Sequence, residues 1–307
     1  MRRCRALLCL ASASALQLAR RELGLAVGVA ASSIGRPAAV AAAAAAPRTI
    51  KQRVELEIDG AVQGATVERL TGESTGLQFP VRDLALFEGA GFEWDAAWPY
   101  TADDMRRIDE NDDTQFYDFP KLVYHIDEGA VAALTQFYAR TIAPGSAILD
   151  ICSSWVSHYP LDFPARMSRI SATGISALEL KANAQLTDFV ARDLNREPKL
   201  PFESASFDVV TCVVSVDYLN KPREVMKEIA RVLKPGGRVI FSQSNRLFYT
   251  KAVKMWLSMD DLGRLEVIGN YIHFADAFEA PRALDISAKG RGAKDPMYIV
   301  DAVRRRA

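Results

Sequence analysis

Hydrophobic and polar residues alternate along this chain with two different periods, which predicts a mixture of strands and helices. Residues 53–58 (RVELEI) alternate polar with apolar side chains, the pattern of a half-buried strand. Residues 127–138 instead place Val131, Leu134 and Phe137 on one face at helical spacing. The chain therefore contains elements of both kinds.

Beyond residue 116, apolar runs of strand length alternate with amphipathic runs of helical length. We predict strands at 147–152, 169–175, 188–193, 207–214, 238–242, 265–273 and 297–303, and helices at 178–186, 223–233 and 247–257. This alternation is typical of an α/β fold, a doubly wound and largely parallel sheet with helices on both faces. Right-handed crossovers place every loop that follows a strand at one edge, where ligands bind.

The stretch before this domain does not follow the same alternation. Gly60, Gly64 and Gly72 punctuate it with turns, so we predict that residues 51–115 form a small N-terminal extension with some β structure. Residues 102–113 within it are rich in acids. A solvated loop or helix surface explains these acids better than a metal site.

Composition narrows the classes of partner. The net charge is +0, but the first 50 residues hold seven arginines and one acid, which leaves a net charge of about −6 from Lys51 onward. A nucleic-acid ligand is not expected, because phosphate binding needs a positive surface. Cys152 and Cys212 lie in apolar runs and are predicted to be buried thiols. Without a CxxC pair or clustered histidines, no metal site is predicted.

The first 46 residues are rich in Ala, Ser and Arg, a composition typical of a cleavable targeting segment. Apolar runs at 6–19 and 23–34 are each shorter than the ~20 residues of a membrane span, so no stable membrane span is expected in the mature chain. The second run follows Arg20 and Arg21. The segment resembles a chloroplast transit peptide followed by a twin-arginine signal for the thylakoid lumen. Secretion, a mitochondrial presequence and bacterial twin-arginine export remain alternatives.

Four motifs follow one another in an order and spacing found in a known family. They are AILDIC at 147–152, TGISALE at 173–179, RDLN at 192–195 followed by LPF and SFD, and IARVLKPGGRV at 229–239. In these motifs the chain resembles the class I S-adenosylmethionine-dependent methyltransferases, in their type 11-like, small-molecule subgroup. The resemblance implies a Rossmann-like doubly wound sheet, mostly parallel with an antiparallel last strand, over residues 116–307.

The chain departs from the family in the loop after the first strand of this domain. The family has Gly-x-Gly-x-Gly there, whereas residues 152–158 are CSSWVSH. This SSWxSH pattern resembles an uncharacterised branch of the family. Serines can offer backbone N–H groups and hydroxyls to the methionine carboxylate of the donor, but Trp155 is too bulky for a close approach. We therefore predict that this loop takes a different path.

The resemblance also implies which residues hold S-adenosylmethionine. Asp150 matches the acid that ends the first strand of the domain, and Ser176 stands where the family binds the ribose. Glu179 is an alternative at that position, and both residues also fit the capping of a helix. Asp193 is expected to accept the adenine amino group, with Leu194 packed on the ring. The implied cofactor-binding residues are Asp150, Cys152, Ser153, Ser154, Ser176, Asp193, Leu194 and Ser215.

The predicted function is methyl transfer from S-adenosylmethionine to a small-molecule acceptor. Such an enzyme chiefly positions donor and acceptor, and a base is needed only if the acceptor must lose a proton. The candidates for this role are His125, His158 and Tyr218, although a structural hydrogen bond explains either histidine equally well. The missing glycines leave open a non-catalytic binding or assembly protein with this fold, and a protein methyltransferase is a further alternative.

Overall fold

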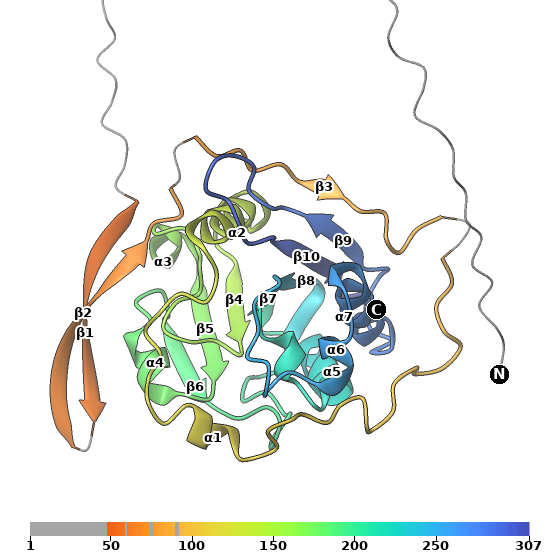
Figure 1. Cartoon of the computed structure of the whole chain (residues 1–307), viewed down its shortest axis with the longest axis horizontal. Helices are drawn as coiled ribbons and strands as arrows, with labels where there is room; N and C mark the ends of the chain where they lie inside the picture. The colour runs from red at the N-terminus through yellow and green to blue at the C-terminus, as the bar shows by residue number, and fades with distance from the viewer. Residues whose placement is uncertain (1–47, 59, 74–75, 90–91, 307) are drawn as a thin grey trace, which may run out of the picture. The chain divides into compact units, whose positions relative to one another are not determined.

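The computed structural model describes residues 48–58, 60–73, 76–89 and 92–306. The predicted targeting segment, residues 1–46, lies outside the described residues. A hairpin of β1 (Thr49–Ile58) and β2 (Ala61–Leu70) forms one sheet, and eight further strands form the other (Figure 1). The predicted strand at 53–58 is therefore confirmed as part of β1.

The larger sheet has the order β3-β9-β10-β8-β7-β4-β5-β6. Its strands are β3 (Arg82–Asp83), β4 (Ala147–Ile151), β5 (Arg169–Gly174), β6 (Asp188–Ala191), β7 (Phe207–Val213), β8 (Leu233–Gln243), β9 (Arg282–Asp285) and β10 (Tyr298–Val303). β4 to β8 pair in parallel, whereas β10 is antiparallel to both β8 and β9. Counted from β4, this is the doubly wound order 3-2-1-4-5-6 with the antiparallel last strand inserted, so the predicted fold class is confirmed.

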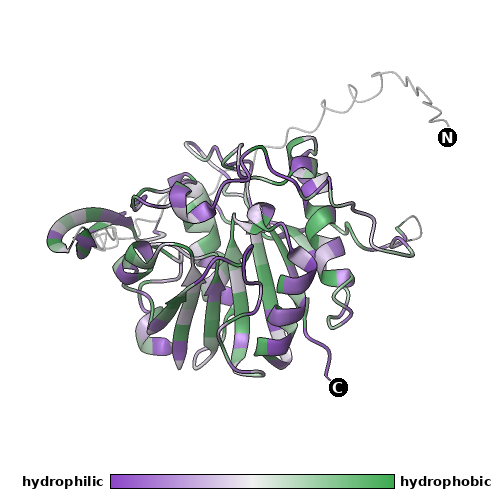
Figure 2. Ribbon diagram, turned by 90° about the horizontal axis from the view of Figure 1, so that it is seen from below, coloured by the Kyte–Doolittle hydropathy of each residue, from purple (hydrophilic) through white to green (hydrophobic). Residues whose placement is uncertain are grey.

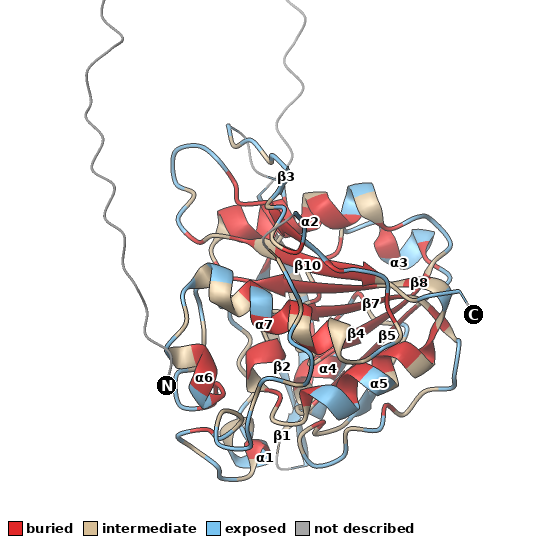
Figure 3. Ribbon diagram, turned by 90° about the vertical axis from the view of Figure 1, so that its right-hand side faces the viewer, coloured by how far each residue is buried: buried red, intermediate tan, exposed pale blue. Residues whose placement is uncertain are grey.

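Helices cover both faces of this sheet. They are α1 (Asp113–Phe116), α2 (Glu128–Thr141), α3 (Phe163–Arg166), α4 (Ala177–Ala182), α5 (Pro222–Val232), α6 (Lys254–Leu257) and α7 (Asp261–His273), with a 3-10 turn at Val216–Tyr218. Successive strand residues point to opposite faces, so Ile148 packs in one core cluster with α2 and Leu149 in the other with α5 and α7. Figures 2 and 3 show these hydrophobic, buried strands between helices with exposed outer faces.

The strand predicted at 265–273 is wrong, because this segment forms the last nine of the thirteen residues of α7 (Asp261–His273). Its alternation of apolar residues misleads, since Leu265, Ile268 and Ile272 also share one helical face and all three are buried. Asp260 begins the helix by accepting a hydrogen bond from the Gly263 N–H at 2.9 Å. The helix predicted at 247–257 is confined to α6, and the short strands β3 and β9 were not predicted.

The N-terminal extension contacts the rest of the fold at two places. Val54 and Leu56 of β1 are buried against Trp155 and Ala182, and β3 pairs with β9 and forms the far edge of the larger sheet. Within the described ranges, no helix has the length and apolar character needed to cross a membrane.

Candidate functional site

A cavity of about 240 Å³ opens at the carboxyl ends of β4, β5, β6 and β7. This is the edge at which the strand order reverses between β4 and β7, where doubly wound sheets bind ligands. The strap, defined here as residues 107–126, and the segment 246–251 supply the remaining walls. All eight residues implied for the cofactor and all three catalytic candidates line this cavity. Their roles remain predictions.

The loop after β4 has an unusual backbone. Cys152, at the first position where the family has glycine, adopts a φ of 52°, and His158 adopts a φ of 58°. Few residues other than glycine enter this region, and strained residues of this kind gather at functional sites. The loop lies directly over the end of β5, because a Cβ on Gly174 would be 2.1 Å from the Ser153 carbonyl oxygen.

Trp155 shows the different path that this loop takes. Its indole lies 5.1 Å from the Tyr124 ring and donates from Nε1 to the Val123 carbonyl at 3.1 Å. The ring is buried in the cluster beneath β1 and does not line the cavity. The bulky side chain is therefore accommodated outside the space that a donor would occupy.

Ser153 is already committed to hydrogen bonds within the protein. Its N–H donates to the Thr173 carbonyl at 2.9 Å, and its hydroxyl donates to Asp150 Oδ2 at 2.6 Å. The carbonyl of Ser154 accepts from Asn183 at 3.0 Å. The serines were expected to offer N–H and hydroxyl groups to a carboxylate, but Ser153 has neither donor free in this arrangement.

Asp150 anchors this loop from below. Its side chain is buried and accepts hydrogen bonds from Ser153 and from Thr211 Oγ1, the latter at 3.0 Å. Burial raises the pKa of Asp150 to about 6, although these hydrogen bonds oppose the shift. Asp150 therefore holds Ser153 in place at the wall of the cavity.

The residues that the family resemblance assigns to adenosine lie at the carboxyl ends of β5 and β6, and this part of the cavity is called the adenosine end here. Ser176 caps α4 by accepting from the Glu179 N–H at 3.3 Å, as the capping interpretation predicted. Glu179 is buried and accepts from the Lys121 N–H at 2.7 Å, and burial raises its pKa. Asp193 Oδ1 accepts from the Asn195 N–H at 2.8 Å, and Leu194 is buried beside it.

The three catalytic candidates differ in their surroundings. His125 lies at the exposed rim of the cavity, 5.0 Å from the Phe248 ring, and partial desolvation of its imidazole together with the charge of Lys121 lowers its pKa. The Nδ1 atom of His158 is buried without a hydrogen-bond partner among the described residues, and burial lowers the pKa of His158 to about 3. The Tyr218 hydroxyl accepts from the Phe248 N–H at 2.8 Å, and burial raises its pKa.

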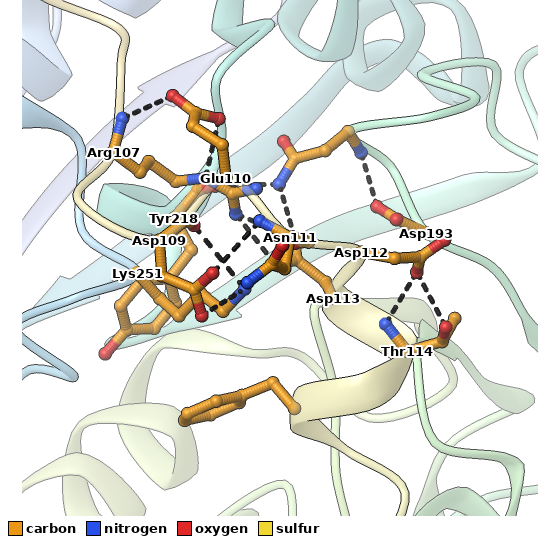
Figure 4. Close-up of polar contacts among 12 residues, drawn as sticks. Arg107, Asp109, Glu110, Asn111, Asp112, Asp113, Thr114, Asp193, Tyr218 and Lys251 are labelled. Atoms are coloured by element: carbon orange, nitrogen blue, oxygen red, sulfur yellow. Dashed lines mark hydrogen bonds and ion pairs between the residues drawn. The ribbon is translucent and has the colours of Figure 1, made fainter.

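A buried ion cluster fixes the strap beside the adenosine end (Figure 4). Asp113 accepts from Arg107 at 2.7 Å, lies 3.0 Å from the Lys251 ammonium, and accepts from Asn195 Nδ2 at 3.1 Å. Asn195 also donates to the Tyr218 carbonyl at 2.9 Å. The expectation that all the acids of 102–113 are solvated is wrong for Asp113, which is buried. Nothing in the sequence signals that these distant segments meet.

Comparison with known proteins agrees with this geometry. Residues 156–241 match the family described as the methyltransferase domain. With the strand order and the cavity at the switch point, this match identifies a class I S-adenosylmethionine-dependent methyltransferase domain in the chain. S-adenosylmethionine is the cofactor of that class.

The chain is similar to several methyltransferases over parts of their length. The ubiquinone biosynthesis O-methyltransferase of Idiomarina loihiensis is 44% identical over 55 residues, 18% of this chain and 21% of that protein. The demethylmenaquinone methyltransferase of Bacillus mycoides is 31% identical over 119 residues, 34% of this chain and 47% of the relative. The sterol 4-C-methyltransferase strm-1 of Caenorhabditis elegans is 36% identical over 102 residues, 31% and 27% of the two chains.

The chain thus spans less than half the length of each of these curated relatives. Among solved structures, a methyltransferase of Thermotoga maritima, described as a possible histamine N-methyltransferase, aligns at 16% identity with a TM-score of 0.43. That alignment covers 58% of this chain and 90% of the other.

Proposed function

We propose that this protein transfers a methyl group from S-adenosylmethionine to a small-molecule acceptor. The observation that carries the proposal is the cavity at the carboxyl ends of β4 to β7, which is lined by every residue that the family pattern assigns to the donor. The names of the relatives refer to ubiquinone biosynthesis, demethylmenaquinone and a sterol, which supports a small-molecule acceptor.

The adenosine end of the cavity fits the donor. Asp193 uses Oδ1 within its own turn, whereas its Oδ2 accepts no hydrogen bond from the residues that the structure describes and is available to the adenine amino group. Leu194 offers an apolar wall, and Ser176 offers a hydroxyl near the ribose position. When bound, S-adenosylmethionine supplies a methyl group on an activated sulfonium. The cavity residues then have to align donor and acceptor and exclude water.

His125 is the proposed base for acceptors that must lose a proton. Its lowered pKa keeps the imidazole neutral at physiological pH, so that it can accept a proton. His158 is a weaker base because its pKa is about 3, and the Tyr218 hydroxyl is held by the Phe248 N–H. His125 is also the candidate at the exposed rim of the cavity, where an acceptor can enter.

A labelled methyl donor tests the proposal. The full chain is incubated with S-adenosylmethionine that carries a labelled methyl group and with a fractionated plastid extract. We expect label in a small-molecule fraction, and heat-inactivated protein gives the background. Label on a polypeptide would instead identify a protein methyltransferase.

A non-catalytic protein with this fold is the second candidate. The observation that favours it is the loop after β4, in which Ser153 donates both its N–H and its hydroxyl to protein groups. Under this alternative the donor binds, but no component of the extract becomes labelled. The two functions therefore give opposite results in the same assay.

We also propose that residues 1–46 direct the protein to the chloroplast. The twin-arginine signal within them, Arg20-Arg21 and the apolar run at 23–34, would then direct it to the thylakoid lumen. The acid-poor, Arg- and Ala-rich composition and the Arg20-Arg21 pair support this proposal. Import into isolated chloroplasts tests it. We expect a shortened, protease-protected product. An unprocessed chain that stays outside the organelle would favour secretion, mitochondrial import or bacterial twin-arginine export instead.

A further inference from the structure

Five basic side chains line the cavity, and four of them already have carboxylate partners. Arg107 pairs with Asp113 at 2.7 Å, Lys251 with Asp109 and Asp113 at 3.0 Å each, Arg192 with Glu197 at 2.8 Å, and Arg246 with Asp295 at 2.9 Å. Lys121 is the fifth, and its ammonium forms no ion pair with any residue that the structure describes. Glu179 accepts from the main-chain N–H of Lys121 instead.

The ammonium of Lys121 is nevertheless held in one place. Its Nζ donates to the Phe116 carbonyl at 2.6 Å, and it lies 4.1 Å from the Phe116 ring centre and 4.9 Å from that of Tyr117. An ammonium group has three N–H donors. One of them donates to Phe116, and the other two form no hydrogen bond with any residue that the structure describes, while the two aromatic rings hold the ammonium at the cavity wall.

Lys121 lines the same cavity as the loop after β4. The lining includes Tyr117 and Lys121 of the strap together with Cys152 and Ser153 of that loop. The main-chain N–H of Lys121 also donates to Glu179 of α4 at 2.7 Å, which fixes the strap at this wall of the cavity. In the family pattern, the amino-acid end of the donor lies at the loop after β4, where Ser153 has no free donor.

We propose that Lys121 binds the α-carboxylate of the methionine moiety of the donor and replaces the backbone donors of a glycine-rich loop. The inference rests on the proposed function, because it requires that S-adenosylmethionine occupies this cavity. It assigns the ammonium of Lys121 a role that Ser153 does not fill, because both donors of Ser153 bind protein groups. A carboxylate that is already desolvated gains most from a charge-assisted hydrogen bond.

Two ligands that differ by one carboxylate test this assignment. Calorimetry measures the affinity of the full chain for S-adenosylhomocysteine and for its decarboxylated analogue S-adenosyl-3-thiopropylamine, in the wild type and in Lys121→Met. Lys121→Arg keeps the charge, and Lys181→Met makes the same exchange on the exposed surface of α4, outside the cavity. The analogue reports whether the adenosine end of each variant is intact.

We expect Lys121→Met to weaken S-adenosylhomocysteine binding by about 10- to 100-fold, the range of a charge-assisted hydrogen bond, and to leave binding of the analogue within about twofold. Lys121→Arg should recover most of the loss, and Lys181→Met should match the wild type. Equal losses for both ligands, or no loss for either, would overturn the assignment while the wild type still binds. A wild type that binds neither ligand would overturn the proposed function as well.

Discussion

Asp217 carries the most strongly perturbed carboxyl group near the site. Neither of its oxygens accepts a hydrogen bond from another residue in the described ranges, and burial raises its pKa from 3.8 to about 8, against a smaller opposing effect of Arg264. The pKa in the folded state therefore exceeds that of the unfolded chain. The group stabilises the fold while it is protonated, and this contribution is lost as the pH rises from about 4 to about 8.

Replacing Asp217 with Asn removes this titration. We expect the stability of the wild type to fall relative to Asp217→Asn between pH 5 and pH 8, by at least the ~1.4 kcal/mol that one pKa unit represents. Asp150 titrates in both proteins, so its effect cancels in the difference. Urea unfolding at several pH values measures the two curves. Parallel curves would show that Asp217 is ionised throughout.

At the residue scale, the motifs predicted which side chains gather but not what they contact. The order of the four motifs was enough to bring Asp150, Ser176 and Asp193 to one cavity. The Ser153 N–H donates to Thr173 because the loop lies close to β5, and the residue types alone do not reveal this close approach. The partners of Asp113 come from segments far apart in the chain, so no local pattern could predict them.

At the scale of elements, the contact between the loop after β4 and the end of β5 determines the shape of the cavity. Gly174 ends β5 beneath this loop, and a Cβ there would meet the Ser153 carbonyl oxygen at 2.1 Å and its nitrogen at 3.2 Å. Backbone atoms cannot give way as a flexible side chain can. A methyl group at Gly174 must therefore displace the loop.

Gly174→Ala should weaken S-adenosylhomocysteine binding by about tenfold or more and destabilise the fold by about 1–3 kcal/mol, as overpacking does. Gly64→Ala is the matched control, because a Cβ there meets only the Arg53 side chain at 3.4 Å in the exposed strand β2. Calorimetry and thermal unfolding measure both effects. If Gly174→Ala binds like Gly64→Ala, the position of the loop is not critical for the donor.

Most strands and helices followed from apolar periodicity, and the exception at 265–273 has a local cause. These residues have buried side chains on more than one face, so their pattern fits a strand and a helix equally well until Asp260 is recognised as the cap. That the loop after β4 departs from the family path was predicted from Trp155. Where the indole packs depends on the hairpin of β1 and β2, a distant element that supplies its apolar surface.

At the scale of the molecule, the cavity is assembled from parts that are remote in sequence. The strap, the loops after β4 to β7 and the segment 246–251 meet around it. The cluster of Arg107, Asp113 and Lys251 joins the strap to the segment 246–251. Buried ion pairs become costly when one partner is removed. The strap and the segment 246–251 are therefore coupled through this cluster, and we expect donor binding to depend on the whole assembly.

Calorimetric titration of the full chain with S-adenosylhomocysteine tests the central claim most directly. We expect one binding site per chain, with an affinity that falls by about tenfold in Asp193→Ala, because the adenine amino group would lose its acceptor in a buried site. Arg82→Ala, whose side chain is largely exposed at the far edge strand β3, should bind like the wild type. No binding at high micromolar ligand, or equal binding by Asp193→Ala, would contradict the account.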